Sequence, residues 1–228
     1  MQIICSFRSI KYAFIATLFT LVACAPVETH KTIQPTTVPA KQTSYQGPKT
    51  TLVVANFDNR SNYMQGLFST GTNRLGNQAK TILKSHLQQS QRFRIVDREN
   101  MAEIQQEAAL IGKQQTLKGA RYAITGAVSE FGRKTTGDRQ LFGILGSGKT
   151  QTAYSKVTLS VVDVLTSEIV FSTQGAGEYA LSEREVLGFG SDTGYDATLN
   201  GKVLNLSIME ATNNLITAIE NGTFAIQQ

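Results

Sequence analysis

Residues 157–173 read VTLSVVDVLTSEIVFST and carry the clearest structural signal in the chain. Within this stretch, Val157–Leu165 and Glu168–Thr173 are rich in β-branched residues, which favour buried strands. Thr166 and Ser167 stand between the two runs. The stretch therefore predicts two strands joined by a tight turn.

The rest of the folded part predicts further strands and helices. Short β-branched or alternating runs indicate strands, and apolar residues three or four apart indicate amphipathic helices. The expected strands are Thr51–Phe57, Phe93–Asp97 and Ala120–Val128. The expected helices span residues 72–90 and 101–111, and a third has its apolar stripe over residues 204–219, with Asn200 near its start and Gly222 as a left-handed cap. We expect these elements to form one mixed α+β domain over residues 49–228.

The first residues predict export from the cytoplasm. Arg8 and Lys11 precede the uncharged apolar run AFIATLFTLVA at residues 13–23, which is typical of a secretory signal peptide over residues 1–23. The run is shorter than the ~20 residues of a membrane-spanning helix. It ends in Leu-Val-Ala before Cys24, as in a bacterial lipobox, which predicts a lipid (palmitate among its acyl chains) on the Cys24 thiol. The alternative is an ordinary signal peptide with a chance cysteine.

The residues after Cys24 predict a tether in the outer membrane. Ala25 stands where an aspartate would favour the inner membrane, so we expect an outer-membrane anchor with the domain facing the periplasm. Residues 24–48 include all four prolines and show no apolar periodicity, which indicates a flexible tether. Cys5 would leave with the signal peptide, so no disulfide is expected.

Composition argues against several classes of function. Without the signal peptide the chain has 20 basic and 17 acidic residues, a net charge of +3, and no basic stripe with interleaved aromatics. We therefore expect no nucleic-acid partner. His30 and His86 are the two histidines and neither clusters with cysteine, so no metal site is expected. No catalytic constellation is visible, and we expect neither enzymatic activity nor a cofactor.

Residues 143–150 read GILGSGKT and match the phosphate-binding pattern G-x-x-x-x-G-K-[ST]. That motif needs a buried strand before it and a helix after it. Here polar residues precede the motif and a β-rich run follows Lys149 and Thr150. Asp163, in the position of a magnesium-binding aspartate, comes too soon to leave room for the helix. We expect no nucleotide binding and interpret the glycines as a hairpin tip.

Residues 129–156 and 174–199 do not suit a compact domain. Both are long, rich in Gly, Ser and Thr, and without helical period. Each has the length to fold in half as a β-hairpin whose arms could cross a bilayer, since a tilted strand needs about 9–11 residues. Mobile surface loops are the alternative that the pattern leaves open.

The chain resembles the curli secretion channel (CsgG) family over residues 49–222. Its firmest stretch is Phe142–Ile169, where FGI, the alternating V-x-L strand, the VV-polar-V step and the T-x-E-I turn follow the family pattern; RFRIVDR at residues 92–98 also corresponds. The resemblance implies a periplasmic α/β domain with two hairpins per protomer. Nine protomers of that family close one transmembrane β-barrel of about 36 strands.

The resemblance also implies a pore constriction. The family narrows its channel with a tyrosine followed, four residues later, by Asn-Phe. This chain has Tyr63, then Leu67 and Phe68 at the same spacing. We therefore expect Tyr63, Leu67 and Phe68 at the constriction, with Leu67 in place of the polar residue. The alternative is that Tyr63 and Phe68 pack against the core.

The function implied is a nucleotide-independent diffusion channel for secretion of unfolded, curli-like amyloid subunits. Its expected partners are sister copies, the outer membrane, the unfolded fibre subunits and periplasmic accessory factors. The rival interpretation is an interaction lipoprotein with a related domain but no pore, such as a cell-wall synthase activator or a surface-polymer anchor.

Overall fold

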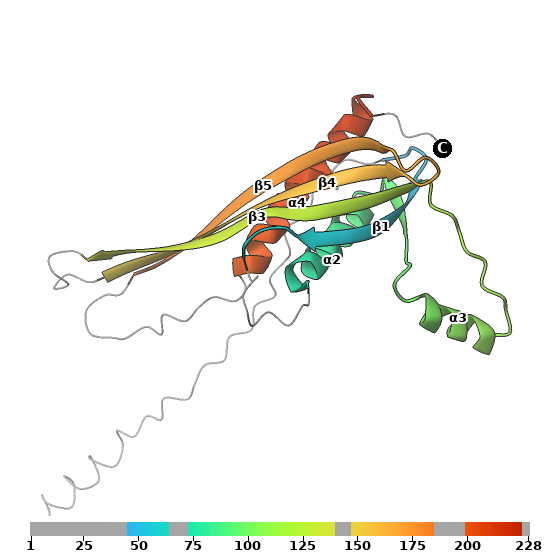
Figure 1. The fold of residues 1–228 in the computed structure, drawn as a ribbon, viewed down its shortest axis with the longest axis horizontal. Coiled ribbons are helices and arrows are strands. Elements are labelled where there is room, and N and C mark those ends of the chain that lie inside the picture. Colours follow the sequence, from blue (N-terminus) through green and yellow to red (C-terminus); the bar gives the residue numbers. More distant parts are fainter. Residues whose placement is uncertain (1–44, 64–72, 140–146, 185–198, 225–228) are drawn as a thin grey trace, which may run out of the picture. The chain divides into compact units, whose positions relative to one another are not determined.

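The computed structural model describes residues 45–63, 73–139, 147–184 and 199–224, which form one mixed sheet with three helices (Figure 1). The expected mixed α+β class is confirmed. The strands are β1 (Thr50–Asn59), β2 (Phe93–Val96), β3 (Tyr122–Arg139), β4 (Ser147–Asp163) and β5 (Ile169–Arg184), and the helices are α2 (Arg74–Gln89), α3 (Met101–Leu110) and α4 (Leu199–Glu220). Strands β3, β4 and β5 run well beyond the bounds expected from sequence, because they continue into the glycine-rich segments.

The sheet has the order β2-β1-β3-β4-β5. Strand β1 runs parallel to β2 and to β3, whereas β3, β4 and β5 are antiparallel to one another. The tight turn predicted between β4 and β5 is confirmed, and Ser167 occupies it with a φ of 60°. The Asp163 carboxylate holds this turn by accepting hydrogen bonds from the backbone N–H groups of Leu165 (2.8 Å) and Thr166 (3.3 Å). These bonds, the Leu165 bond first, lower the pKa of Asp163.

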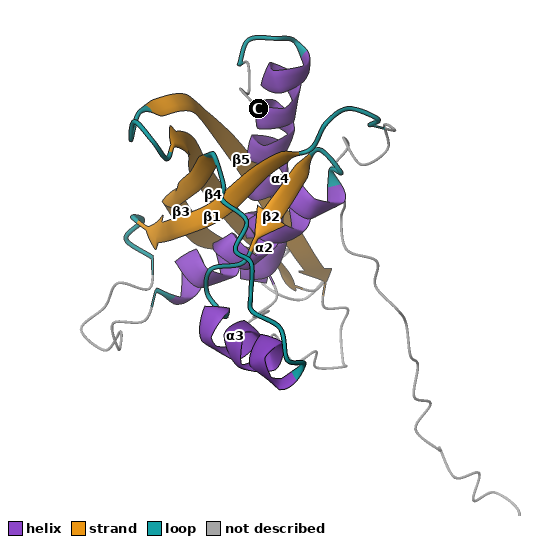
Figure 2. Ribbon diagram, turned by 90° about the vertical axis from the view of Figure 1, so that its right-hand side faces the viewer, coloured by secondary structure: helices purple, strands orange, loops and turns teal. Residues whose placement is uncertain are grey.

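One face of the sheet is buried beneath α2 and α4, which also pack on each other (Figure 2). Side chains on β4 alternate between this face and the outside, as a half-buried antiparallel strand requires. The core consists of apolar residues from the sheet and the two helices, including Leu52, Phe57, Leu83, Leu87, Ile124, Val157, Leu159, Leu204, Ile208 and Leu215. The core therefore lies between β1, β3, β4 and β5 on one side and the two helices on the other.

Helix α4 lies very close to β5. A Cβ atom added at Gly175 would stand 2.2 Å from the Ser207 carbonyl oxygen, and one at Gly177 would meet Leu206 at 2.8 Å. These glycines therefore allow the helix backbone to approach the strand. The helix ends as predicted, with Gly222 in the left-handed region at a φ of 71°.

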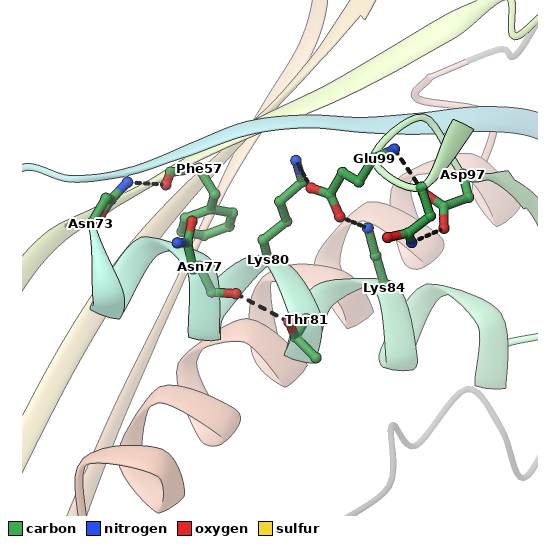
Figure 3. Close-up of polar contacts among 9 residues, drawn as sticks. Phe57, Asn73, Asn77, Lys80, Thr81, Lys84, Asp97 and Glu99 are labelled. Atoms are coloured by element: carbon green, nitrogen blue, oxygen red, sulfur yellow. Dashed lines mark hydrogen bonds and ion pairs between the residues drawn. The ribbon is translucent and has the colours of Figure 1, made fainter. Parts of the chain in front are cut away.

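Helix α3 forms where the apolar spacing predicted it, but none of its residues is buried. Leu110 and Ile111, at its end, are 73% and 72% exposed. The turn before α3 is fastened to α2, because Lys80 and Lys84 both form ion pairs with Glu99 (Figure 3). Hydrogen bonds from these two lysines lower the pKa of Glu99.

The three-stranded segment beyond the main sheet is called the ribbon here: residues 129–139 of β3, 147–156 of β4 and 174–184 of β5. It begins at a β-bulge at Ser129, since Val128 pairs with Val157 but Glu130 already pairs with Lys156. A bulge bends its strand, and β3 parts from β1 at this point. Both arms of the first expected hairpin pair in register as far as Arg139 and Ser147.

The second expected hairpin joins the same ribbon. Its first arm, residues 174–184, pairs with β4 along its whole length, from Gln174 opposite Thr158 to Arg184 opposite Gly148. The expected return arm lies in residues 185–198, outside the described residues. The two glycine-rich segments are thus joined through β4 and β5, which the sequence did not indicate.

Candidate functional site

Tyr63 ends a short turn that follows β1. The Asn59 side chain organises this turn: its Oδ1 accepts hydrogen bonds from the Ser61 backbone N–H (3.1 Å) and hydroxyl (2.6 Å), and its Nδ2 donates to the Tyr63 carbonyl (2.9 Å). An asparagine is suited to this because it hydrogen-bonds the backbone two residues on. Tyr63 is therefore fixed relative to the end of β1 by a local sequence device.

The far end of segment 64–72 is held at the same strand. Asn73 caps α2 by accepting from the Gly76 N–H (3.1 Å), and the same Oδ1 accepts from the Asn59 N–H (3.2 Å). Its Nδ2 donates to the Phe57 carbonyl at 2.7 Å (Figure 3). Two asparagines thus bring both ends of the predicted constriction segment to the end of β1.

The Tyr63 side chain points into contacts with two other elements. Its ring lies 4.6 Å from the ring of Phe131 on β3, measured between centroids. Its hydroxyl accepts a hydrogen bond from Nδ2 of Asn200, the second residue of α4, at 3.1 Å. Tyr63 is half-buried as a result.

Arg133 continues this set of contacts into the ribbon. Its guanidinium donates to Oδ1 of Asn200 at 3.3 Å and to Oε1 of Gln151 at 3.0 Å. Gln151 lies on β4 and is only 6% exposed. We call the four residues Tyr63, Arg133, Gln151 and Asn200 the polar junction, because they lie where the ribbon emerges from beneath α4.

The polar junction contains one of the predicted site residues, Tyr63. Cys24, Leu67 and Phe68 lie outside the described residues. The sequence interpretation missed Arg133, Gln151 and Asn200. Arg133 carried a usable signal, since it follows Phe131 by two residues and so must share its inward face on a strand. Asn200 carried none, because its partners are distant in sequence.

The polar junction contains no histidine, cysteine, aspartate or glutamate. Across the described ranges no group of three or more His, Cys, Asp or Glu could hold a metal ion. Lys149 and Thr150, the end of the phosphate-binding pattern, lie in strand β4 where that motif would require a helix. The polar junction consists of one guanidinium, two amides and one phenol, which hydrogen-bond to one another and so hold their elements in position.

His86 forms a second buried polar contact, between α2 and α4. Its Nε2 donates to Oδ1 of Asn205 at 2.9 Å, while its Nδ1 has no hydrogen-bonding partner among the described residues. Burial lowers the pKa of His86, and the Asn205 bond opposes this only in part. His86 is thus a neutral structural histidine at neutral pH.

No helix in the described part of the chain is both long and apolar enough to span a membrane.

A family model described as "Curli production assembly/transport component CsgG" matches residues 36–227. The Neisseria meningitidis serogroup B protein named "Putative lipoprotein NMB1126/NMB1164" is 54% identical over 209 residues, which cover 92% of this chain and 93% of that protein.

Among solved structures, the PelC dodecamer from Paraburkholderia phytofirmans is similar with a TM-score of 0.35 and 18% identity, over 74% of this chain and 93% of that one. Lipoprotein GNA1162 from Neisseria meningitidis gives a TM-score of 0.32 and 12% identity, over 77% of this chain and 98% of that one. Both TM-scores are low.

Proposed function

Because the chain belongs to the curli production assembly/transport component CsgG family, we propose that its copies form a secretion channel in the outer membrane. Each copy would be anchored through a lipid on Cys24, and the described domain would face the periplasm. The name of the meningococcal relative, a putative lipoprotein, supports the anchor. The cargo would be unfolded, curli-like fibre subunits, moved without nucleotide by the concentration and entropy of the confined chain.

The observation that carries this proposal is that, among the described residues, each edge of the ribbon has no further strand beside it. Beyond Ser129, β3 has β4 on one side and no other described strand beside it. Strand β5 likewise has β4 as its one described neighbour. Unpaired N–H and C=O groups along such edges accept another strand. The expected return arm in residues 185–198 would pair with β5, sister copies around a ring would supply the remaining strands, and a closed ring would leave no edge.

The proposed constriction consists of Tyr63, Leu67 and Phe68. The described residues on either side of segment 64–72 are Tyr63, in the polar junction, and Asn73, which bonds to Phe57 and Asn59 of β1. A Phe68→Ala variant should raise single-channel conductance, because it removes an aromatic ring from the narrowest part. An unchanged conductance would show that Phe68 does not line the narrowest part of the channel.

A second candidate is the interaction lipoprotein without a pore, and one observation favours it. The described ribbon has charged side chains on both faces: Glu130 and Lys156 form a pair on one face, and Arg133 lies on the other. A basic side chain facing lipid costs about 2–4 kcal/mol at the bilayer midplane. Under the channel proposal, the hydrocarbon must therefore begin beyond these residues, towards segments 140–146 and 185–198.

Conductance in planar bilayers separates the two candidates. The purified, detergent-extracted chain should insert as large oligomers that give discrete conductance steps. Absence of steps at all protein concentrations, together with a monomer in detergent, would favour the interaction lipoprotein.

The lipid anchor has its own test. Cells fed labelled palmitate should label the parent chain and a Cys5→Ser variant equally, because Cys5 leaves with the signal peptide. A Cys24→Ser variant should lose the label. Label that persists in Cys24→Ser would contradict the proposed anchor.

A further inference from the structure

The contacts of Tyr63 indicate a structural role in addition to the proposed narrowing of a channel. We propose that Tyr63, Asn200 and Arg133 form a positioning relay that fixes the start of segment 64–72 to the base of the ribbon. The consequence for transport rests on the proposed channel, whereas the relay itself is a property of the domain.

Three segments far apart in sequence meet in this relay. Tyr63 directly precedes segment 64–72, and Arg133 lies in the first arm of the first hairpin. Asn200 is the second residue of α4, one residue beyond segment 185–198, which would hold the return arm of the second hairpin. The separations are 67 residues from Arg133 to Asn200 and 137 from Tyr63 to Asn200. The relay therefore joins the first hairpin to the described residues that flank segments 64–72 and 185–198.

The hydrogen bonds of the relay have defined donors and acceptors. A guanidinium only donates hydrogen bonds, so the Asn200 group that faces Arg133 must be its Oδ1. This leaves Nδ2 to donate to the Tyr63 hydroxyl oxygen. The second Arg133 contact, to Gln151, holds the guanidinium against β4. Each bond thus orients the next, and Asn200 cannot turn its amide without losing the bond from Arg133.

The arrangement predicts that Tyr63 moves with the ribbon. When sister copies hold the ribbons in a ring, the relay would hold Tyr63 of every copy at a fixed position relative to the ribbons. Asn200 and Arg133 are positioning residues in this scheme and touch no cargo. The Tyr63 hydroxyl would anchor the residue to Asn200, and this role does not depend on whether the ring narrows the channel.

Amide hydrogen exchange of the purified full chain tests the relay without requiring a pore. Asn200→Leu removes both bonds, and Tyr63→Phe removes one while keeping the ring on Phe131. Both should speed exchange in residues 58–63 by roughly 2- to 10-fold, the range of one net hydrogen bond. The double variant should show no further increase. Exchange in β2 should stay unchanged.

Two variants act as matched controls. Asn200→Asp should keep parental exchange, because a carboxylate accepts from Arg133 and from the Tyr63 hydroxyl. Asn214→Leu makes the same change on the same helix and removes the bond from Asn214 to the Gln174 carbonyl (3.0 Å), away from the relay. It should leave residues 58–63 unaffected.

Unchanged exchange in Asn200→Leu would overturn the relay, and so would an equal rise in β2, which would show a general loss of stability. Where the parent conducts, Asn200→Leu should increase the open-channel current fluctuations and Asn200→Asp should not. If the parent does not conduct at all, the proposed channel fails while the exchange result still decides the relay.

Discussion

Strands β3, β4 and β5 pass through two environments, one beneath α4 and one beyond it. Beneath the helix, the inward positions of β4 are Val157, Leu159 and Val161, all buried. In the ribbon, the inward positions of β4 are the small or polar residues Ser155, Ala153 and Gln151, and exposed residues such as Lys134 follow on β3. Backbone pairing continues in register through both halves. Backbone pairing therefore determines the geometry of these strands in both halves. The inward side chains of β4 are large and apolar only where a helix covers them.

The largest expected effect separates the two halves by stability. Leu159 is 1% exposed, so Leu159→Ala should lower the free energy of unfolding by about 2–5 kcal/mol through lost burial and a cavity. Lys134→Ala in the uncovered half should change it by no more than about 0.5 kcal/mol. Urea unfolding of the purified chain measures both. Similar losses would show that the ribbon contributes to the same core.

Two glycines of the ribbon sharpen the comparison, because Gly175 lies against α4 and Gly132 lies against the Tyr154 side chain. Gly175→Ala would place a Cβ 2.2 Å from backbone oxygen of α4, which cannot move aside, and should cost about 1–3 kcal/mol. Gly132→Ala also crowds a neighbour at 2.4 Å, but that neighbour is the half-exposed Tyr154 ring, which can swing outward. Its cost should stay below about 1 kcal/mol. Equal costs would mean that Tyr154 is held as firmly as the helix.

The stability of the helical cover should depend on pH through His86. Because the pKa of His86 is lowered in the fold, the unfolded chain binds more protons below its ordinary value of 6.5. Stability is therefore complete above that value and falls as pH drops from 6.5 towards the lowered pKa. His86→Gln should flatten this slope in urea unfolding between pH 7 and pH 5. His30→Gln is the control and should preserve it.

The smallest effect is expected on the open face of the ribbon. Glu130 and Lys156 pair at 3.0 Å with both side chains largely exposed. A double-mutant cycle with Glu130→Gln and Lys156→Gln should give a coupling energy of no more than about 1 kcal/mol. The coupling should vanish in 1 M salt, where charges are screened beyond about 3 Å. A larger, salt-resistant coupling would indicate that this face is covered in solution.

Helices α2 and α3 show how far periodicity leads. Both have apolar residues at helical spacing, and both form helices close to the expected bounds. Only α2 buries its apolar face, through residues such as Leu83 and Leu87, whereas α3 buries none. Helical spacing is a local property, but burial depends on whether another element reaches that face. The sequence could therefore predict that α3 forms, but not whether its apolar face is buried.

The sequence by itself determined the elements, the tight turn at Ser167 and the family, because these depend on neighbouring residues and on a pattern that extends along the chain. Only the tertiary structure joined the two glycine-rich segments in one ribbon and brought Tyr63, Arg133 and Asn200 together. The physical reason is distance along the chain: contacts between residues 67 and 137 positions apart depend on strand order and register, which no local spacing records.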